Sequence, residues 1–518
     1  MSRDVTITVD GRPVAAPEGA TLASVLLGAG VTHFRTSVTG EPRGPVCGMG
    51  VCFECRVTVD GRPHRRSCLI PCTDGLRIDT MPNATAAPAP APPEEAGTTT
   101  CDVAVIGGGP AGIAAAASAA ESGARVVVID QELHPGGQIW RHRTPETLPR
   151  AARAWIARAE RALTGGGSSW RAQSTVFDAS LGDGVALRLT GCAAGDHTVR
   201  AQRVIIATGA RELFLPFPGW TLPSVMGLGG AQALLKGGMT VRGRRAVVAG
   251  SGPLLLPVAA ALERAGACVV CVAEQAPLGQ AAAFGARLWA HPTKLAQAMG
   301  YAASLAGTRL RFGTWVAAAE GDEGVARVRL TNGRRAWWVT CDLVCCSYGF
   351  VPNLEVAHVL GCDVQRGRVV VDRTQRTSVP NVWCAGEPTG VAGEAAALVE
   401  GRIAGFDAAG AAALAASTSL QRARDAWQRF GVRLTDAFRP RDEVRTLATA
   451  ETIVCRCEDV RHAALDPAWT MRQAKLYTRV TMGPCQGMIC GAVCTSLFGW
   501  PPGTVRPPVG GAHVARLG

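Results

Sequence analysis

The chain has 518 residues and a formal net charge of +12, with 47% hydrophobic and 18% charged residues. That length exceeds a single compact core, and the composition is that of a globular protein of about two to four domains. The positive charge comes almost entirely from scattered arginines without a sustained basic run, which argues against a nucleic-acid partner.

No apolar run is long enough to span a membrane, and the opening stretch MSRDVTITVDG lacks the apolar core of a signal peptide. We therefore expect no membrane span and a cytoplasmic location. There the 19 cysteines would stay reduced, which argues against a disulfide framework.

Residues 1–82 form the first predicted domain. The segments VTITV and RPVAAP flank a turn at Asp10-Gly11 and predict a hairpin. A helix follows in GATLASVLLGAG with Thr21 as its N-cap, and RVTVDG predicts a later strand. This order predicts a small β-grasp, ferredoxin-like module.

Four cysteines in this module follow the spacing C-x4-C-x2-C-x12-C. Iron–sulfur clusters are held by thiolates, and the intervening Gly48 and Gly50 let the backbone approach the sulfides. A zinc site and a disulfide framework are the weaker alternatives. Cys72 is interpreted as a buried thiol outside the site. The predicted [2Fe–2S] ligands are Cys47, Cys52, Cys55 and Cys68.

A Pro/Ala-rich linker is predicted at residues 83–100, and residues 101–130 read as strand, glycine turn, helix and strand. The turn has the pattern G-x-G-x-x-G, which brings a backbone close to a dinucleotide pyrophosphate. The acid at the end of the second strand would hold a ribose hydroxyl. The predicted contacts are Gly107, Gly109, Gly112 and Asp130.

Three further segments resemble marks of the two-dinucleotide flavoprotein family: Gly136-Gly137-Gln138, Thr208-Gly209 and Gly386-Glu387. The family usually carries Asp where this chain has Glu387. The resemblance implies FAD bound by residues 101–220 and 341–410, with an NAD-like domain inserted at 221–340.

The inserted domain contains a second strand–turn–helix–strand unit at residues 244–274. Gly250 and Gly252 match the glycine pattern, but the third position is Leu255, whose side chain hinders close packing near a pyrophosphate. Glu274 would suit NAD rather than NADP. Whether this domain binds a nucleotide stays open. Cys268, Cys271, Cys345 and Cys346 lie in predicted strands and are interpreted as small hydrophobic residues.

The last predicted region spans residues 411–518. Its cysteines resemble those of the bacterioferritin-associated ferredoxin domain, a small helical [2Fe–2S] domain, although the second pair in that family is usually C-x2-C. Zinc is therefore the alternative, and Cys494 is a spare candidate ligand. The predicted ligands are Cys455, Cys457, Cys485 and Cys490.

Two stretches carry a wider resemblance. PRGPVCGMGVCFECRVTVDG followed by RSC looks very like the small subunit of hydrogen cyanide synthase, and the flanks of the C-terminal cysteines resemble opine oxidases and the large subunit of that synthase. The chain thus resembles both subunits fused. The chain is also similar to the FAD subunits of opine and hydroxyproline dehydrogenases and to the α chain of sarcosine oxidase.

The resemblance implies an α/β, Rossmann-like, doubly wound flavoprotein with FAD and two [2Fe–2S] clusters, which oxidises a C–N bond to an imine and passes the electrons on. A small amine or amino acid would bind a partner flavoprotein subunit of the D-amino-acid-oxidase type. NAD, or a second flavin at a subunit interface, is a further cofactor left open. No catalytic residue is identified. The alternatives are an NADH-driven reductase feeding a ferredoxin or oxygenase, and a zinc-filled scaffold.

Overall fold

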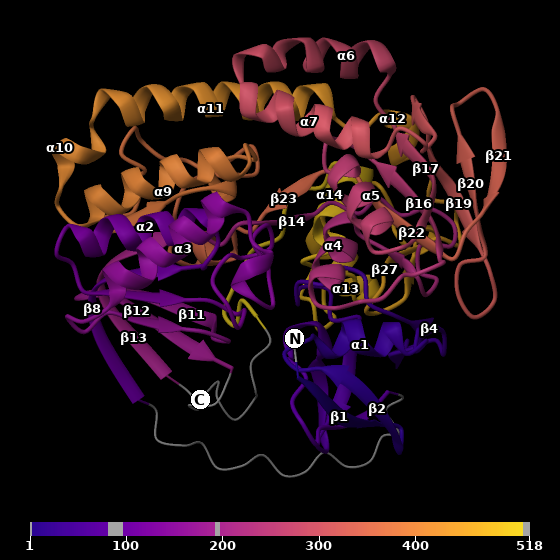
Figure 1. The fold of residues 1–518 in the computed structure, drawn as a ribbon, viewed down its shortest axis with the longest axis horizontal. Helices are drawn as coiled ribbons and strands as arrows, with labels where there is room; N and C mark the ends of the chain where they lie inside the picture. The colour runs from indigo at the N-terminus through magenta and orange to yellow at the C-terminus, as the bar shows by residue number, and fades with distance from the viewer. Residues whose placement is uncertain (1–2, 81–96, 192–196, 511–518) are drawn as a thin grey trace. The chain divides into compact units, whose positions relative to one another are not determined.

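The computed structural model describes residues 3–80, 97–191 and 197–510, so most of the predicted linker lies outside the described residues. The chain divides into two compact units, each assembled from three stretches (Figure 1). The first unit comprises Met1–Pro88, Glu212–Gly349 and Asp436–Gly503, and the second unit comprises Ala89–Arg211, Phe350–Thr435 and Thr504–Gly518. The domain boundaries expected from the sequence stay a prediction.

The N-terminal part of the first unit is a five-stranded mixed sheet with one helix, α1 (Leu22–Gly28), whose apolar side chains are buried. The predicted hairpin is confirmed, because β1 and β2 pair in antiparallel register. Thr21 precedes α1 in an extended conformation, but its hydroxyl bonds Ser24 Oγ and makes no capping bond. In sheet order the strands are β2 (Arg12–Pro17), β1 (Asp4–Val9), β7 (Arg77–Asp79), β5 (Arg56–Val59) and β6 (Arg62–Arg66); β3 (Arg35–Thr36) and β4 (Pro42–Arg43) form a separate pair.

The middle part of the first unit contains two sheets, a five-stranded parallel sheet and a three-stranded antiparallel sheet. The parallel sheet has the order β15 (Val225–Met226), β22 (Leu343–Ser347), β16 (Arg245–Gly250), β17 (Cys268–Glu274) and β18 (Leu310–Phe312). The antiparallel sheet contains β19 (Trp315–Glu320), β20 (Arg327–Thr331) and β21 (Ala336–Thr340). The helices are α4 (Leu228–Lys236), α5 (Leu255–Arg264), α6 (Leu278–Ala286) and α7 (Pro292–Ser304).

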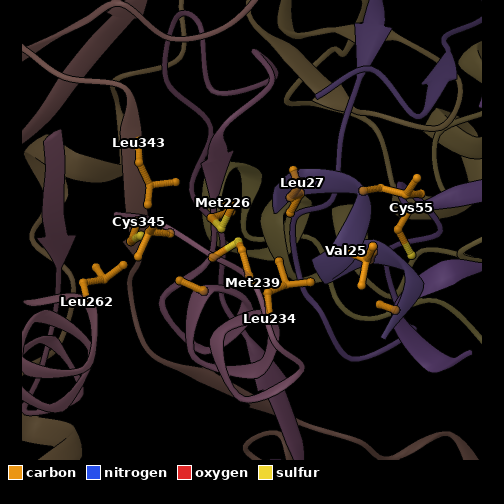
Figure 2. Close-up of a cluster of buried hydrophobic side chains, with 14 of the residues drawn as sticks. Val25, Leu27, Cys55, Met226, Leu234, Met239, Leu262, Leu343 and Cys345 are labelled. Atoms are coloured by element: carbon orange, nitrogen blue, oxygen red, sulfur yellow. The ribbon is translucent and has the colours of Figure 1, made fainter. Parts of the chain in front are cut away.

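One hydrophobic core joins these two parts of the first unit. Figure 2 shows Val25 and Leu27 of α1 facing Leu234 of α4, with Met226 and Met239 between them and strand β22. The contact is also polar, because Ser24 Oγ donates to the Leu234 carbonyl across 2.8 Å in the interior. The ferredoxin-like module is therefore packed against the parallel sheet domain through α1 and α4.

The C-terminal part of the first unit is small and helical. A capping box begins α13 (Met471–Thr478): Thr470 Oγ1 accepts from the Gln473 backbone, and the Gln473 side chain accepts from the Thr470 backbone. The helix ends at Arg479, which has a left-handed backbone. The elements are α12 (Asp442–Arg445), β27 (Ile453–Cys455), β28 (Val460–Arg461), α13 (Met471–Thr478) and α14 (Cys490–Phe498).

The second unit is built on a seven-stranded sheet with helices α2 and α3 on one face (Figure 1). Its order is β10 (Ser169–Arg171), β9 (Val126–Ile129), β8 (Gly97–Ile106), β13 (His197–Ile206), β12 (Gly184–Thr190) and β11 (Thr175–Gly182), and β26 (Val382–Cys384) also pairs with β13. The helices are α2 (Pro110–Glu121), α3 (Arg150–Leu163), α8 (Glu355–Val359), α9 (Glu394–Ala408), α10 (Ala412–Ala415) and α11 (Thr418–Ala437).

Small residues set the spacing of α2 and α9. A Cβ atom on Gly401 would lie 2.1 Å from the Ala111 carbonyl oxygen, and one on Gly405 would lie 2.3 Å from that of Ala115. Both pairs are four residues apart and so lie on one face of each helix. The two glycines of α9 are therefore needed for its close packing against α2. No helix among the described residues is long and apolar enough to cross a bilayer.

Candidate functional site

The residues predicted to contact FAD gather at one edge of the sheet of the second unit. Four parallel strands end there in register, since Ile129, Ile106, Ile206 and Cys384 pair across β9, β8, β13 and β26. Ligands of open α/β sheets bind outside the carboxyl ends of the strands. The predicted residues follow these ends directly: Asp130, Gly107, Thr208, Gly209, Gly386 and Glu387.

The glycine turn between β8 and α2 has no room for side chains. Gly107 has φ +108°, and a Cβ on Gly112 would lie 1.8 Å from the Gly107 carbonyl oxygen. Gly109 precedes the first residue of α2 and has open space where a Cβ would project. A pyrophosphate fits such a cradle, because the first amides of the helix point toward it.

Asp130 supports the turn from the end of β9. One carboxylate oxygen accepts from the Gly108 amide, and the other accepts from the Glu132 amide at 2.6 Å. Burial raises the pKa of Asp130 to about 7. Trp170 is a further residue at this turn that no sequence motif indicates: its ring lies beside Gly108, and its buried indole nitrogen has no hydrogen-bond partner among the described residues.

The segment Gly136-Gly137-Gln138 lies against the same turn. The Gly136 amide donates to the Gly108 carbonyl at 2.8 Å, and a Cβ on Gly137 would lie 2.9 Å from Gly109 Cα. Gln138 Nε2 donates to Glu132 at 3.1 Å, while Gln138 Oε1 is buried without a partner in the described part of the chain. A buried oxygen that accepts no hydrogen bond from the protein is available to a bound polar cofactor, so Gln138 Oε1 fits a cofactor site.

The remaining two predicted segments are fixed by backbone contacts. Thr208 Oγ1 donates to the Asn353 carbonyl at 2.7 Å, and Asn353 Nδ2 donates back to the Thr208 carbonyl at 2.8 Å. Glu387 accepts from the Gly393 amide at 2.9 Å, and burial raises its pKa to about 7. Glu387 thus lies at the expected edge with one carboxylate oxygen engaged by the protein.

The four cysteines of the N-terminal module are buried and paired. Cys52 donates to Cys47, and Cys68 donates to Cys55, which lowers the pKa of the Cys55 thiol below its ordinary value. The Met49 amide also donates to Cys47 Sγ at 3.5 Å. A [2Fe–2S] cluster takes two ligands on each of its irons, so two pairs of thiols in a loop with inward amides fit it.

Close backbone packing shapes this cysteine loop. Gly48 and Gly50 have φ of +60° and +80°, as a left-handed backbone requires, and a Cβ on Gly48 would lie 2.9 Å from the Gly230 carbonyl oxygen of α4. Arg66 also fixes the loop, because its Nη1 donates to the Gly50 carbonyl at 2.8 Å. Cys72 is buried, and burial raises its pKa to about 12, as an inert thiol requires.

The four C-terminal cysteines form a second group. Cys457 and Cys490 both donate to Cys485, which lowers the pKa of Cys485 well below its ordinary value, and Cys490 also bonds Cys455. Cys494 is buried in the adjoining core, where burial raises its pKa to about 12. Within the described ranges, no set of three or more His, Cys, Asp or Glu side chains is arranged round one ion position.

The second glycine turn, in the first unit, differs from the first. Helix α2 begins directly after Gly109, whereas α5 begins at Leu255, two residues later than the equivalent position, and Leu255 is buried. Glu274 accepts from the Gly252 amide at 2.7 Å, as Asp130 does in the first turn. Strand β17 buries Cys271, as expected of a small hydrophobic residue. The same interpretation is wrong for Cys268, which is exposed at the first position of the strand.

A later segment of the chain covers this second turn. The Phe438 side chain lies 3.8 Å from the position of a Cβ on Gly252, and Ser251 Oγ donates to the Phe438 carbonyl at 2.6 Å. Gln275 Nε2 donates to the Arg439 carbonyl at 3.3 Å, and its oxygen accepts from the Arg441 amide at 3.1 Å. Protein atoms therefore occupy the surface on which a nucleotide pyrophosphate would rest.

Comparison with known proteins shows the family of the chain. The family described as pyridine nucleotide-disulphide oxidoreductase matches residues 101–417, more than half of the chain. The chain belongs to this family. A 2Fe-2S iron-sulfur cluster binding domain matches residues 2–82 of this oxidoreductase. The predicted flavoprotein fold with an N-terminal ferredoxin-like domain is confirmed.

Curated relatives of this oxidoreductase include components of larger enzymes. It is 32% identical to an opine oxidase subunit of Agrobacterium tumefaciens over 77% of this chain and 85% of the relative. It is 30% identical to the hydrogen cyanide synthase subunit HcnB of Pseudomonas aeruginosa over 76% of this chain and 91% of the relative. The HcnA subunit of the same organism is 42% identical over 15% of this chain and 77% of HcnA. The predicted resemblance to both fused subunits is confirmed.

The crystal structure of L-proline dehydrogenase from P. horikoshii has the same fold. It superposes with a TM-score of 0.74 at 20% sequence identity and covers 100% of this chain and 98% of that chain. The agreement extends over all parts of the pyridine nucleotide-disulphide oxidoreductase described above. It supports the fold alone.

Proposed function

We propose that the chain is the FAD and iron–sulfur electron-transfer subunit of an amine or amino-acid dehydrogenase or oxidase. The observation that carries the proposal is the combination of a glycine cradle at the sheet edge with two groups of four buried cysteines. FAD, when bound, would accept electrons that originate in the C–N bond of the substrate, and iron–sulfur clusters accept electrons singly.

The chain's own residues have distinct tasks in this proposal. Gly107, Gly109 and Gly112 leave space for the pyrophosphate, and Asp130 offers a carboxylate to the ribose. Residues 136–138 and Glu387 border the remainder of the cofactor. The support is that all these residues follow strand ends that lie in register or pack against the turn at one of them.

Each group of four cysteines would hold one [2Fe–2S] cluster. Support for a cluster rather than zinc comes from the N-terminal thiols, which bond in two separate pairs, Cys47 with Cys52 and Cys55 with Cys68. The C-terminal thiols bond in one chain through Cys485. A zinc ion would be surrounded by four thiolates at tetrahedral positions.

The substrate would bind a partner flavoprotein subunit rather than this chain. The opine oxidase relative and HcnB are each named as one subunit of an enzyme, and we transfer that property to the present chain as part of the proposal. The neighbourhood of the flavin site offers two histidines, His134 and His142, stacked with ring centres 5.5 Å apart, but no acid–base pair is assigned.

An NADH-driven reductase is the second candidate, because Glu274 supports its turn as Asp130 does. The covering segment at Phe438 and the late start of α5 favour the amine-oxidising subunit over this reductase.

The test is to purify the chain with its partner under anaerobic conditions and to measure flavin, iron and acid-labile sulfide. The expected result is flavin together with about four irons and four sulfides for each chain, the content of two [2Fe–2S] clusters. An amine or amino acid should bleach the flavin when the partner is present. Zinc in place of iron and sulfide, or bleaching by NADH alone, would contradict the proposal.

A further inference from the structure

Two charged residues connect the cysteine sites of the first unit. Glu54 lies between Cys52 and Cys55, and Arg456 lies between Cys455 and Cys457. Arg456 Nη2 is 3.4 Å from Glu54 Oε2, and the side chains are only 4% and 1% exposed. A residue inside one predicted ligand loop is therefore ion-paired with a residue inside the other.

Arg35 adds a second guanidinium to the same carboxylate. Its Nη2 donates to Glu54 Oε1 at 2.8 Å and to the Arg456 carbonyl at 3.1 Å. Arg456 is also anchored on its other side, because its Nη1 donates to the Trp220 carbonyl at 2.9 Å. The Nε atoms of Arg35 and Arg456 are buried without a hydrogen-bond partner among the described residues. Two positive charges and one negative charge thus meet in the interior.

These charges border thiols of both sites. A single small cavity is lined by Cys52, Glu54 and Arg456 and by all four C-terminal cysteines, Cys455, Cys457, Cys485 and Cys490, together with Val46 and Ile489. Charge interactions are strong in such an interior, because little water screens them. A change in charge at Glu54 therefore acts on both cysteine sites.

We propose that Arg35, Glu54 and Arg456 form a charge bridge that joins the two cysteine sites into one electron-transfer unit and sets the reduction potentials of both. The proposal rests on the assignment of a cluster to each site in the proposed function. The transfer moves one electron between the sites: the donor site is oxidised and the acceptor site is reduced, with no proton or other reactant. These three residues are positioning residues.

The sign of each contribution follows from electrostatics. Reduction adds a negative charge to a site, so a nearby carboxylate opposes it and a nearby guanidinium favours it. Removal of the Glu54 charge should raise both potentials, and removal of the Arg35 charge should lower both. Loss of both charges leaves the net charge of the bridge at +1, as in the native protein.

A second buried ion pair provides a matched control. Arg43 Nη2 lies 2.8 Å from Asp459 Oδ1, with exposures of 3% and 0%, and so joins the same two parts of the chain. Asp459 does not line the cavity that contains the thiols. An amide at this position disturbs the contact between the two parts to a similar degree. It also removes a negative charge that interacts with Arg35, but this charge lies outside the cavity beside the thiols.

The experiment is an anaerobic redox titration of the full chain with its partner, followed by electron paramagnetic resonance of the two reduced signals. E54Q should shift both midpoint potentials upward by about 59 mV, equal to a tenfold change in a one-electron equilibrium. R35Q should shift both downward by a comparable amount. The E54Q/R35Q double variant should remain near the native values, and D459N should shift the potentials less than E54Q does.

Each outcome decides the proposal. Opposite shifts for E54Q and R35Q support it, because loosening of the contact would move both variants in the same direction. Full iron and sulfide content with unchanged potentials in both variants would overturn it and leave the proposed function intact. Native protein without iron and sulfide would overturn both. If E54Q does not fold, R35Q and D459N alone give the decisive comparison.

Discussion

Gly112 lies in the first turn of α2 directly against the carbonyl group of Gly107, where a Cβ atom would come within 1.8 Å of the oxygen. The contact draws the helix close to the strand that precedes it. In the second unit of the fold this closeness shapes the cradle proposed for the flavin pyrophosphate. The equivalent Leu255 shows the alternative, since α5 begins two residues later.

The first prediction concerns this contact. Gly112→Ala should push α2 away from β8 and weaken flavin affinity at least tenfold. A tenfold loss equals about 1.4 kcal/mol of binding free energy, which is within the range that overpacking of a core costs. Iron and sulfide content should persist, because the cysteines belong to the first unit. Flavin fluorescence after denaturation and iron analysis measure the two quantities.

Gly300→Ala is the matched control for that prediction. Gly300 lies in α7, and nothing lies within 4 Å of the position of its Cβ. Alanine favours a helix over glycine, so this variant should keep its flavin and unfold no more readily than the native protein. Equal flavin content in Gly112→Ala and Gly300→Ala would contradict the assignment of the cradle.

The second prediction concerns separate loading of the two cysteine sites. Cys52→Ser and Cys457→Ser should each lose about half of the iron and sulfide, because each site would hold one of two clusters. The electron paramagnetic resonance signal that remains should differ between the variants. Cys268→Ser, at an exposed strand position, should keep all of the iron. Complete loss in both variants would indicate one shared site.

The third prediction concerns stability against pH. Burial raises the pKa of Glu274 to about 7 in the folded chain, whereas an unfolded glutamate has a pKa of about 4.3. Between these values only the folded state binds the proton, so stability falls as pH rises. The decline from this group is at most about 1.4 kcal/mol for each pH unit.

The measurement is denaturant unfolding of the cofactor-free protein between pH 5 and pH 8, with about one pH unit between samples. Glu274→Gln should flatten the decline, because the amide does not titrate. Glu320→Gln removes a carboxylate whose side chain is 49% exposed and should leave the slope unchanged. A steeper decline in Glu274→Gln would refute the explanation.

The fourth prediction concerns nicotinamide nucleotides. Phe438 and the backbone around it cover the second glycine turn, so NADH should neither bind the purified chain nor bleach its flavin. Calorimetric titration and stopped-flow absorbance provide the two measurements. Rapid bleaching by NADH in the absence of any amine would favour the reductase candidate instead.

Local motifs account for what could be predicted from the sequence. Two features are determined by a few consecutive residues: the glycine turn at residues 107–112 and the cysteine loop at residues 47–55. The spacing of glycines and cysteines was therefore enough to predict the cradle and the cysteine group. The hairpin at Asp10-Gly11 follows from turn chemistry in the same way. Thr21 was expected to cap α1 but bonds Ser24, because a nearby hydroxyl competes for it.

Contacts between distant segments could not be predicted. Glu54 and Arg456 are 402 positions apart, and nothing in either loop indicates the other. Phe438 reaches Gly252 from a different part of the chain, so its effect on the second turn was hidden. Both features depend on packing between segments that are far apart in the sequence. The spacing of residues within one sequence does not indicate such contacts.

The three-stretch make-up of the first unit has a consequence for synthesis. The ribosome releases the N-terminal cysteine loop long before Arg456 exists, because the chain is synthesised from its N-terminus and the loop and Arg456 belong to different stretches of the unit. The loop therefore passes through a period in which Glu54 has no guanidinium from the far end of the chain beside it. During that interval the guanidinium available to Glu54 is that of Arg35, which the same N-terminal stretch supplies 19 positions earlier.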